Sequence, residues 1–155
     1  MTNYLSIQLY FLDVSNRILV PMDDSEHAGD ALRYAFETHP TATVTVLHVV
    51  GAPSMLMGEA IGLTFEPDLD AAAAEHAAPV FERATAIADE YDRELETIVG
   101  LGHPAREILD RAEAYDGVVI GAHGADFDRA SRRYLVGNVA KTVSTRASVP
   151  VTIVR

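Results

Sequence analysis

The sequence predicts an α/β fold in which a doubly wound, five-stranded parallel sheet has helices on both faces. Five short apolar segments alternate with four longer segments whose apolar residues recur at helical spacing. Such alternation is typical of parallel strands joined by right-handed helical crossovers. The 155 residues, 48% of them hydrophobic, suffice for one domain with a full core.

The first part of the chain begins this pattern with a strand, a helix and a second strand. Residues 17–21 form an apolar run that ends in proline, which indicates a buried strand. Asp24 and Ser25 then offer N-cap oxygens, and the apolar spacing predicts a helix over residues 25–38. Residues 43–50 are β-branched and nearly all apolar, as expected of a strand covered on both faces.

A long loop separates this unit from the second helix. Residues 51–69 contain three glycines and two prolines and show no clear period. Residues 70–95 carry one apolar helical stripe, in which Pro79 either kinks the helix or marks a break near its start. Residues 96–100 form the third predicted strand.

Two helices and two strands complete the predicted fold. Pro104 suits the first position of a helix, and an apolar stripe follows it. Residues 117–121 form the fourth strand, and a helix begins near Asn138. Residues 149–155 close the chain as the fifth strand.

Residues 1–16 do not fit the alternation, so we divide the chain into an N-terminal extension and one domain over residues 17–155. The extension is an extra edge strand, a partner-binding arm, or the poorly packed product of an upstream start codon. We favour the last two over a catalytic role.

The composition excludes several classes of function. A net charge of −11 argues against nucleic-acid binding through a basic surface. Lys141 is the only lysine, and we favour a halophilic-type acidic surface over that of an ordinary acidic protein. The chain has no cysteine and no apolar stretch of about 20 residues that could span a membrane. Since residues 1–16 also lack a signal-peptide pattern, we expect a cytoplasmic protein.

Two loops at the carboxyl ends of the predicted strands form the candidate binding site. In an open α/β sheet, ligands bind at the carboxyl ends of the strands, where the winding reverses. If the first strand is central, the loops after the first and fourth strands flank that point. Residues 21–24 supply a carboxylate there, and Gly121, Gly124 and Gly137 let backbone N–H groups approach an anion. The helix near Asn138 adds a positive dipole end. The alternative is a tight strand-to-helix turn that binds nothing. A short glycine motif, taken by itself, is more often such a turn than a binding site.

Five separated segments of the sequence carry a family resemblance. They are RILVPMDDSEHA, VTVLHVV, GHPAREIL, GVVIGAHG and GNVAKTVSTRASVPVTIVR, in this order. Together they resemble the universal stress protein family from about residue 17 to the C-terminus. The resemblance implies a Rossmann-like sheet with strand order 3-2-1-4-5, with ATP bound in one branch of the family and no nucleotide in another.

In the nucleotide-binding branch, the loop after the fourth strand has the pattern G-x2-G-x9-G-[ST]. The resemblance implies contacts from Pro21, Met22, Asp23, Val44, Ile120, Gly121, Gly124, Gly137, Asn138 and Val139. Asp23 and Val44 correspond to adenine contacts, and the glycine loop to phosphate and ribose contacts. Here twelve residues instead of nine separate the last two glycines, and Asn138 replaces Ser or Thr as an equally good N-cap.

The longer loop also changes the charge near the expected phosphates. Asp126 and Asp128 repel phosphate, three nearby arginines attract it, and a Mg²⁺ ion could bridge the carboxylates to it. His123 could touch a phosphate, although a loop histidine is more often exposed, and His48 fits a hydrogen-bonded structural residue in a strand. We assign no catalytic residue and no metal ligand, and we expect at most slow ATP hydrolysis.

Two functions follow from the resemblance. The first is a homodimeric, ATP-binding switch or sensor in the stress response, paired through the edge strand at residues 149–155. The alternative is a stress protein that binds no nucleotide and acts as a dimeric protein-interaction module. The protein partner and the stress are not specified by the sequence.

Overall fold

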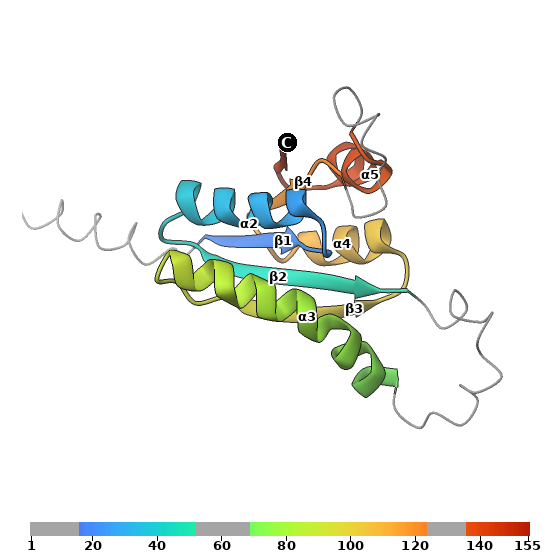
Figure 1. Ribbon diagram of the computed structural model, residues 1–155. Coiled ribbons are helices and arrows are strands. Elements are labelled where there is room, and N and C mark those ends of the chain that lie inside the picture. The colour runs from blue at the N-terminus through green and yellow to red at the C-terminus, as the bar shows by residue number, and fades with distance from the viewer. Residues whose placement is uncertain (1–15, 52–68, 124–135) are drawn as a thin grey trace, which may run out of the picture.

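The computed structural model describes residues 16–51, 69–123 and 136–155 (Figure 1). The strands are β1 (Arg17–Pro21), β2 (Thr43–Val50), β3 (Glu96–Leu101), β4 (Gly117–Gly121) and β5 (Val151–Val154). The helices are α2 (Glu26–Thr38), α3 (Leu69–Glu90), α4 (Pro104–Ala112) and α5 (Asn138–Arg146). Most of the predicted extension and of the predicted long loop lies outside these ranges. Within them, no helix is long and apolar enough to cross a membrane.

The sheet has the strand order β3-β2-β1-β4-β5, and all four neighbouring pairs are parallel. This confirms the predicted doubly wound fold. The chain winds from the central β1 toward β3 on one side and toward β5 on the other. The carboxyl ends of β1 and β4 therefore flank the point where the winding reverses.

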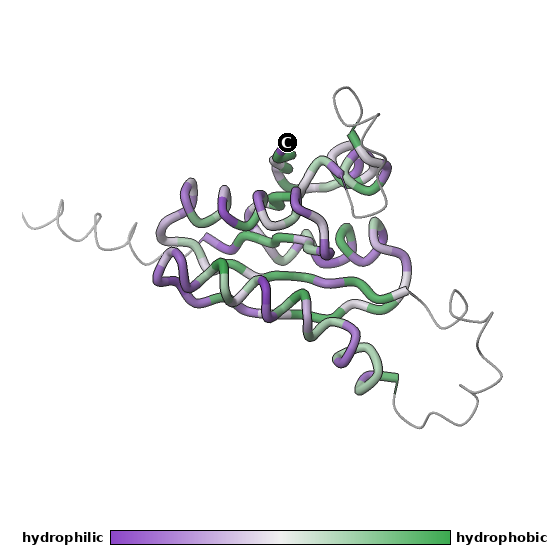
Figure 2. Tube along the Cα trace, in the orientation of Figure 1, coloured by the Kyte–Doolittle hydropathy of each residue, from purple (hydrophilic) through white to green (hydrophobic). Residues whose placement is uncertain are grey.

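The helices form a layer on each face of the sheet, α2 and α3 on one and α4 and α5 on the other (Figure 1). Alternate residues of β1 enter two cores, because successive side chains of a strand point to opposite faces. Ile18 and Val20 pack with α2 and α3, whereas Leu19 packs with α4 and α5. Figure 2 shows the hydrophobic residues along the strands and the hydrophilic ones on the outer helix turns.

The structure rules out a helix break at Pro79, an alternative that the sequence left open, and shortens the last predicted strand. α3 continues from Leu69 to Glu90 with Pro79 inside it, so the proline does not break the helix. β5 begins at Val151 rather than at residue 149. Pro150 has no N–H to donate, and only its carbonyl, which accepts from Val118 at 2.9 Å, joins the ladder.

Candidate functional site

A cavity of about 550 Å³ opens at the carboxyl ends of β1, β2 and β4. Its walls come from the loop after β1, the end of β2, the start of α4, the end of β4 and the start of α5. The volume is typical of sites for small molecules. The position, at the reversal of the winding, is where open α/β sheets bind ligands.

Most of the residues predicted from the sequence come together in this cavity. Its wall contains Pro21, Met22, Asp23, Ile120, Gly121, Gly137, Asn138 and Val139. Gly124 lies outside the described residues. The structure does not bring Val44 to the cavity, because this residue is 1% exposed in the core beneath α2 and α3 and pairs with Ile18 near the start of β1. Val49, at the other end of β2, lines the cavity instead.

Val49 presents backbone groups as well as an apolar side chain. The Met22 N–H donates to the Leu47 carbonyl at 2.8 Å, and β1 then leaves the ladder. Backbone groups two residues apart in a strand point to the same side, so the N–H and C=O of Val49 face the side that β1 has left. Across the described residues, neither group has a partner. The cavity therefore offers one donor and one acceptor at the end of β2.

His48 contacts the backbone at the point where the ladder stops. Its Nδ1 lies 2.8 Å from the Met22 carbonyl oxygen, the acceptor that would otherwise receive the Val49 N–H. A carbonyl only accepts, so Nδ1 carries the proton. The predicted hydrogen bond of His48 is confirmed, and this residue also lines the cavity.

The first turn of α5 forms another part of the wall. Gly137 is the N-cap, and no described side chain caps this helix. The first intrahelical bond is donated by Lys141 to the Gly137 carbonyl at 2.9 Å. The N–H groups of Asn138, Val139 and Ala140 therefore have no acceptor within the helix, and all three residues line the cavity. Asn138 is the first helical residue and not the N-cap that the family resemblance leads us to expect.

Two wall glycines lie close to neighbouring backbone. A Cβ atom at Gly121 would lie 2.8 Å from the backbone C and O atoms of His27, in the first turn of α2. A Cβ atom at Gly137 would lie 3.0 Å from the Ala122 carbonyl oxygen. Close backbone packing therefore requires Gly121 and leaves little space at Gly137, whether or not either glycine also contacts a ligand.

His123 is buried, with 5% of its surface exposed, which makes the expectation of a solvent-exposed histidine wrong. Its ring meets that of His27 edge-on, with centroids 5.2 Å apart. Its carbonyl oxygen accepts a hydrogen bond from Ser25 Oγ at 3.3 Å. The loops after β1 and β4 are therefore joined directly beside the cavity.

The wall combines apolar surface with a few polar groups. Asp23 contributes a carboxylate, whose Oδ1 accepts from the Ser25 N–H at 2.9 Å. Among the residues that the structure describes, no three His, Asp or Glu side chains gather to hold a metal ion. Chemically, the site can hold a flat apolar group at the end of β2 and an anion at the start of α5.

Fold and cavity define the class of this molecule. It is a doubly wound α/β protein with a ligand-sized cavity at the reversal of the sheet winding and a helix N-terminus in the cavity wall. A model of the universal stress protein family matches residues 15–155. The chain belongs to the universal stress protein family.

Individual relatives agree with this assignment over nearly their whole length. The chain is 28% identical over 149 residues to the universal stress protein YxiE of Bacillus subtilis (strain 168), covering 90% of this chain and 99% of that protein. It is similar to the solved structure of the universal stress protein UspA from Lactobacillus plantarum, with 29% identity, a TM-score of 0.68 and coverage of 90% and 97%. A universal stress protein solved in complex with cAMP shares the fold at 17% identity, with a TM-score of 0.68 and coverage of 90% and 97%.

Proposed function

We propose that this protein is a switch or sensor of the stress response that binds an adenine nucleotide, ATP with Mg²⁺. One observation carries the proposal: the three first-turn N–H groups of α5 line the same cavity as the open backbone edge of Val49. The first set suits the oxygens of phosphate, and the second suits the edge of a base.

The phosphate end of the proposed site lies at α5. Three backbone donors and the positive end of the helix dipole favour an anion there. Gly121 and Gly137 keep side chains out of the surrounding wall. The chain has a net charge of −11, which repels a polyphosphate, so Mg²⁺ is expected to accompany the ligand and neutralise part of its charge.

The base end of the proposed site lies at β2. Adenine carries an amino donor beside a ring-nitrogen acceptor, which complements the C=O and N–H of Val49. Leu47, Pro104 and Ile108 supply apolar wall against the faces of the ring. β1 separates β2 from β4, so the carboxyl ends of these two strands are about 10 Å apart, two strand spacings, and the cavity extends across both. The cAMP complex of another family member is consistent with such a ligand.

The test removes one backbone donor without disturbing the fold. Asn138 is the first residue of α5, a position that tolerates proline, and Gly137 before it has φ −61° and ψ 158°, which proline also permits. Asn138→Pro deletes the side chain and the N–H, whereas the control Asn138→Ala deletes the side chain alone. Isothermal titration of both variants with ATP and Mg²⁺ isolates the contribution of the N–H.

We expect Asn138→Pro to bind ATP at least about 10-fold more weakly than Asn138→Ala, the usual loss for a hydrogen bond to a charged group. Adenosine, which has no phosphate, should bind both variants equally. Equal ATP affinities would show that phosphate does not lie at α5. Absence of ATP binding by the unaltered protein would favour the alternative, a protein-interaction module.

We also propose that the protein is a homodimer paired through β5. Among the strands that the structure describes, β5 lies at the edge and pairs only with β4, and all four of its residues are half-buried. An edge strand leaves backbone N–H and C=O groups unpaired on its outer side, and an apolar edge of this kind tends to pair with another strand. Light scattering after size-exclusion chromatography should give twice the mass of one chain, and the mass of one chain would contradict the proposal.

A further inference from the structure

Ser25 connects the two loops that flank the cavity. Its N–H donates to Asp23 Oδ1 at 2.9 Å, which closes the turn before α2. Its Oγ accepts from the Ala28 N–H at 3.2 Å, as an N-cap does, and donates to the His123 carbonyl at 3.3 Å. Since Ser25 is 8% exposed and itself lines the cavity, its position sets the geometry of both loops.

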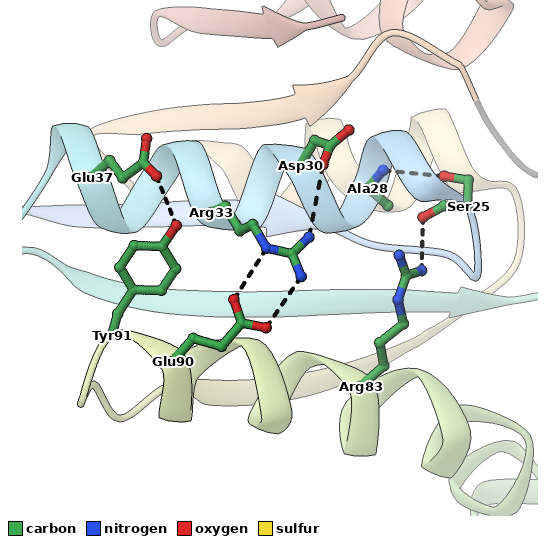
Figure 3. A network of polar contacts seen from close by, with 8 residues as sticks. All are labelled: Ser25, Ala28, Asp30, Arg33, Glu37, Arg83, Glu90 and Tyr91. Carbon is green, nitrogen blue, oxygen red and sulfur yellow. Dashed lines mark hydrogen bonds and ion pairs between the residues drawn. The ribbon is translucent and has the colours of Figure 1, made fainter.

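An arginine from α3 holds the remaining polar group of Ser25. Arg83 Nη1 donates to the Ser25 carbonyl oxygen at 2.8 Å (Figure 3). The helical bond to the same oxygen, from the Gly29 N–H, is long at 3.4 Å, so the arginine makes the closer contact. Gly29 leaves the space that the guanidinium occupies, because a Cβ atom there would lie 2.6 Å from Arg83 Nη2.

We propose that Arg83 is a positioning residue for the nucleotide cavity, acting through Ser25. The arginine does not line the cavity. It fixes the N-cap of α2 and, through Ser25, the loop that carries Asp23 and the carbonyl of His123. This inference rests on the proposed nucleotide site and adds a residue from α3 to it.

The chain contains a matched arginine for comparison at the other end of α2. Arg93, just after α3, donates to the Ala42 carbonyl at 2.7 Å and lies over the Phe36 ring at 5.1 Å. Like Arg83, it is half-buried and binds backbone carbonyls from the same side of the molecule. None of its partners lines the cavity. Arg93→Ala therefore removes similar packing without touching the proposed site.

The experiment compares ATP affinity with thermal stability in four variants. Arg83→Ala and Gly29→Ala should each weaken ATP binding roughly 5-fold or more. Without the arginine contact, ATP binding has to order one further backbone residue, and this entropy loss lowers the affinity. Gly29→Ala acts by displacing the arginine tip, and because alanine is the better helix former, its melting temperature should fall less than that of Arg83→Ala. Arg93→Ala should lower the melting temperature and keep the ATP affinity. Arg83→Lys, which retains a donor on a flexible stem, should restore part of the affinity.

Several outcomes would overturn the assignment. Arg83 would be merely structural if Arg83→Ala and Arg93→Ala weakened ATP binding equally. The same holds if Gly29→Ala kept the full affinity, or if Arg83→Ala lost stability but no affinity. If the unaltered protein binds no ATP, the nucleotide proposal fails with it, and that result is distinct from ATP binding that ignores Arg83.

Discussion

Gly121→Ala is expected to destabilise the protein in the absence of any ligand. The new Cβ atom would lie 2.8 Å from the His27 backbone, 0.6 Å inside the 3.4 Å at which ordinary contacts begin. The three nearest atoms are all backbone, so no side chain can rotate away, and either β4 or the first turn of α2 must move. Overpacking of this kind costs about 1–3 kcal/mol. For a chain of this length, this lowers the melting temperature by roughly 2–12 °C.

Gly117→Ala is the matched control, because it makes the same change in the same strand. Its Cβ atom would lie 3.5 Å from Ile18 Cδ1 and from the Pro150 carbonyl oxygen, which are ordinary contacts. Alanine is also preferred over glycine inside a strand by about 0.5–1 kcal/mol, so this variant should be as stable as the parent or slightly more so. Urea unfolding at 25 °C measures the free energy of unfolding of both variants. Equal stability of Gly121→Ala and the parent would refute the packing argument.

Three further changes test other parts of the structure. Pro79→Ala should stabilise the protein by up to about 3 kcal/mol in urea unfolding, because it restores an N–H inside α3; destabilisation would mean that the helix needs the proline. The hydrogen bond from Tyr91 to Glu37 raises the pKa of Tyr91, so its stabilising effect is full below about pH 10 and is lost as the pH rises through the raised value. Tyr91→Phe should therefore be less stable than the parent at pH 8, with the difference vanishing in stronger alkali, and a constant difference would contradict this. Added salt should raise the melting temperature, because it screens the net charge of −11, and a salt-independent value would argue against a self-repelling acidic surface.

The fold could be predicted from the sequence because local signals and topology agree. The β-branched run over residues 43–50 gave the bounds of β2, and Ser25 marked the start of α2 through its N-cap oxygen. Once strands and helices alternate, the right-handed crossover leaves few arrangements of the sheet. The same logic placed the loops after β1 and β4 together, since the carboxyl ends of parallel strands share one edge.

Other features of the site could not be predicted, because they depend on contacts between residues that are far apart in the sequence. Val44 and Val49 lie in the same apolar run, and only the pairing of Pro21 with Leu47 shows which of them reaches the cavity. The burial of His123 follows from the approach of α2 to β4 rather than from its own neighbours in the sequence. The bond from Arg83 to Ser25 joins residues 58 positions apart, and no sequence pattern marks it.

The central claim is that the cavity binds an adenine nucleotide, and the most direct measurement is of the small molecules that the purified protein carries. Mass spectrometry of the supernatant after heat denaturation should detect ATP or ADP in near-stoichiometric amount, and much less from Asn138→Pro. An empty protein that also takes up no ATP on titration with Mg²⁺ in high salt would contradict the account.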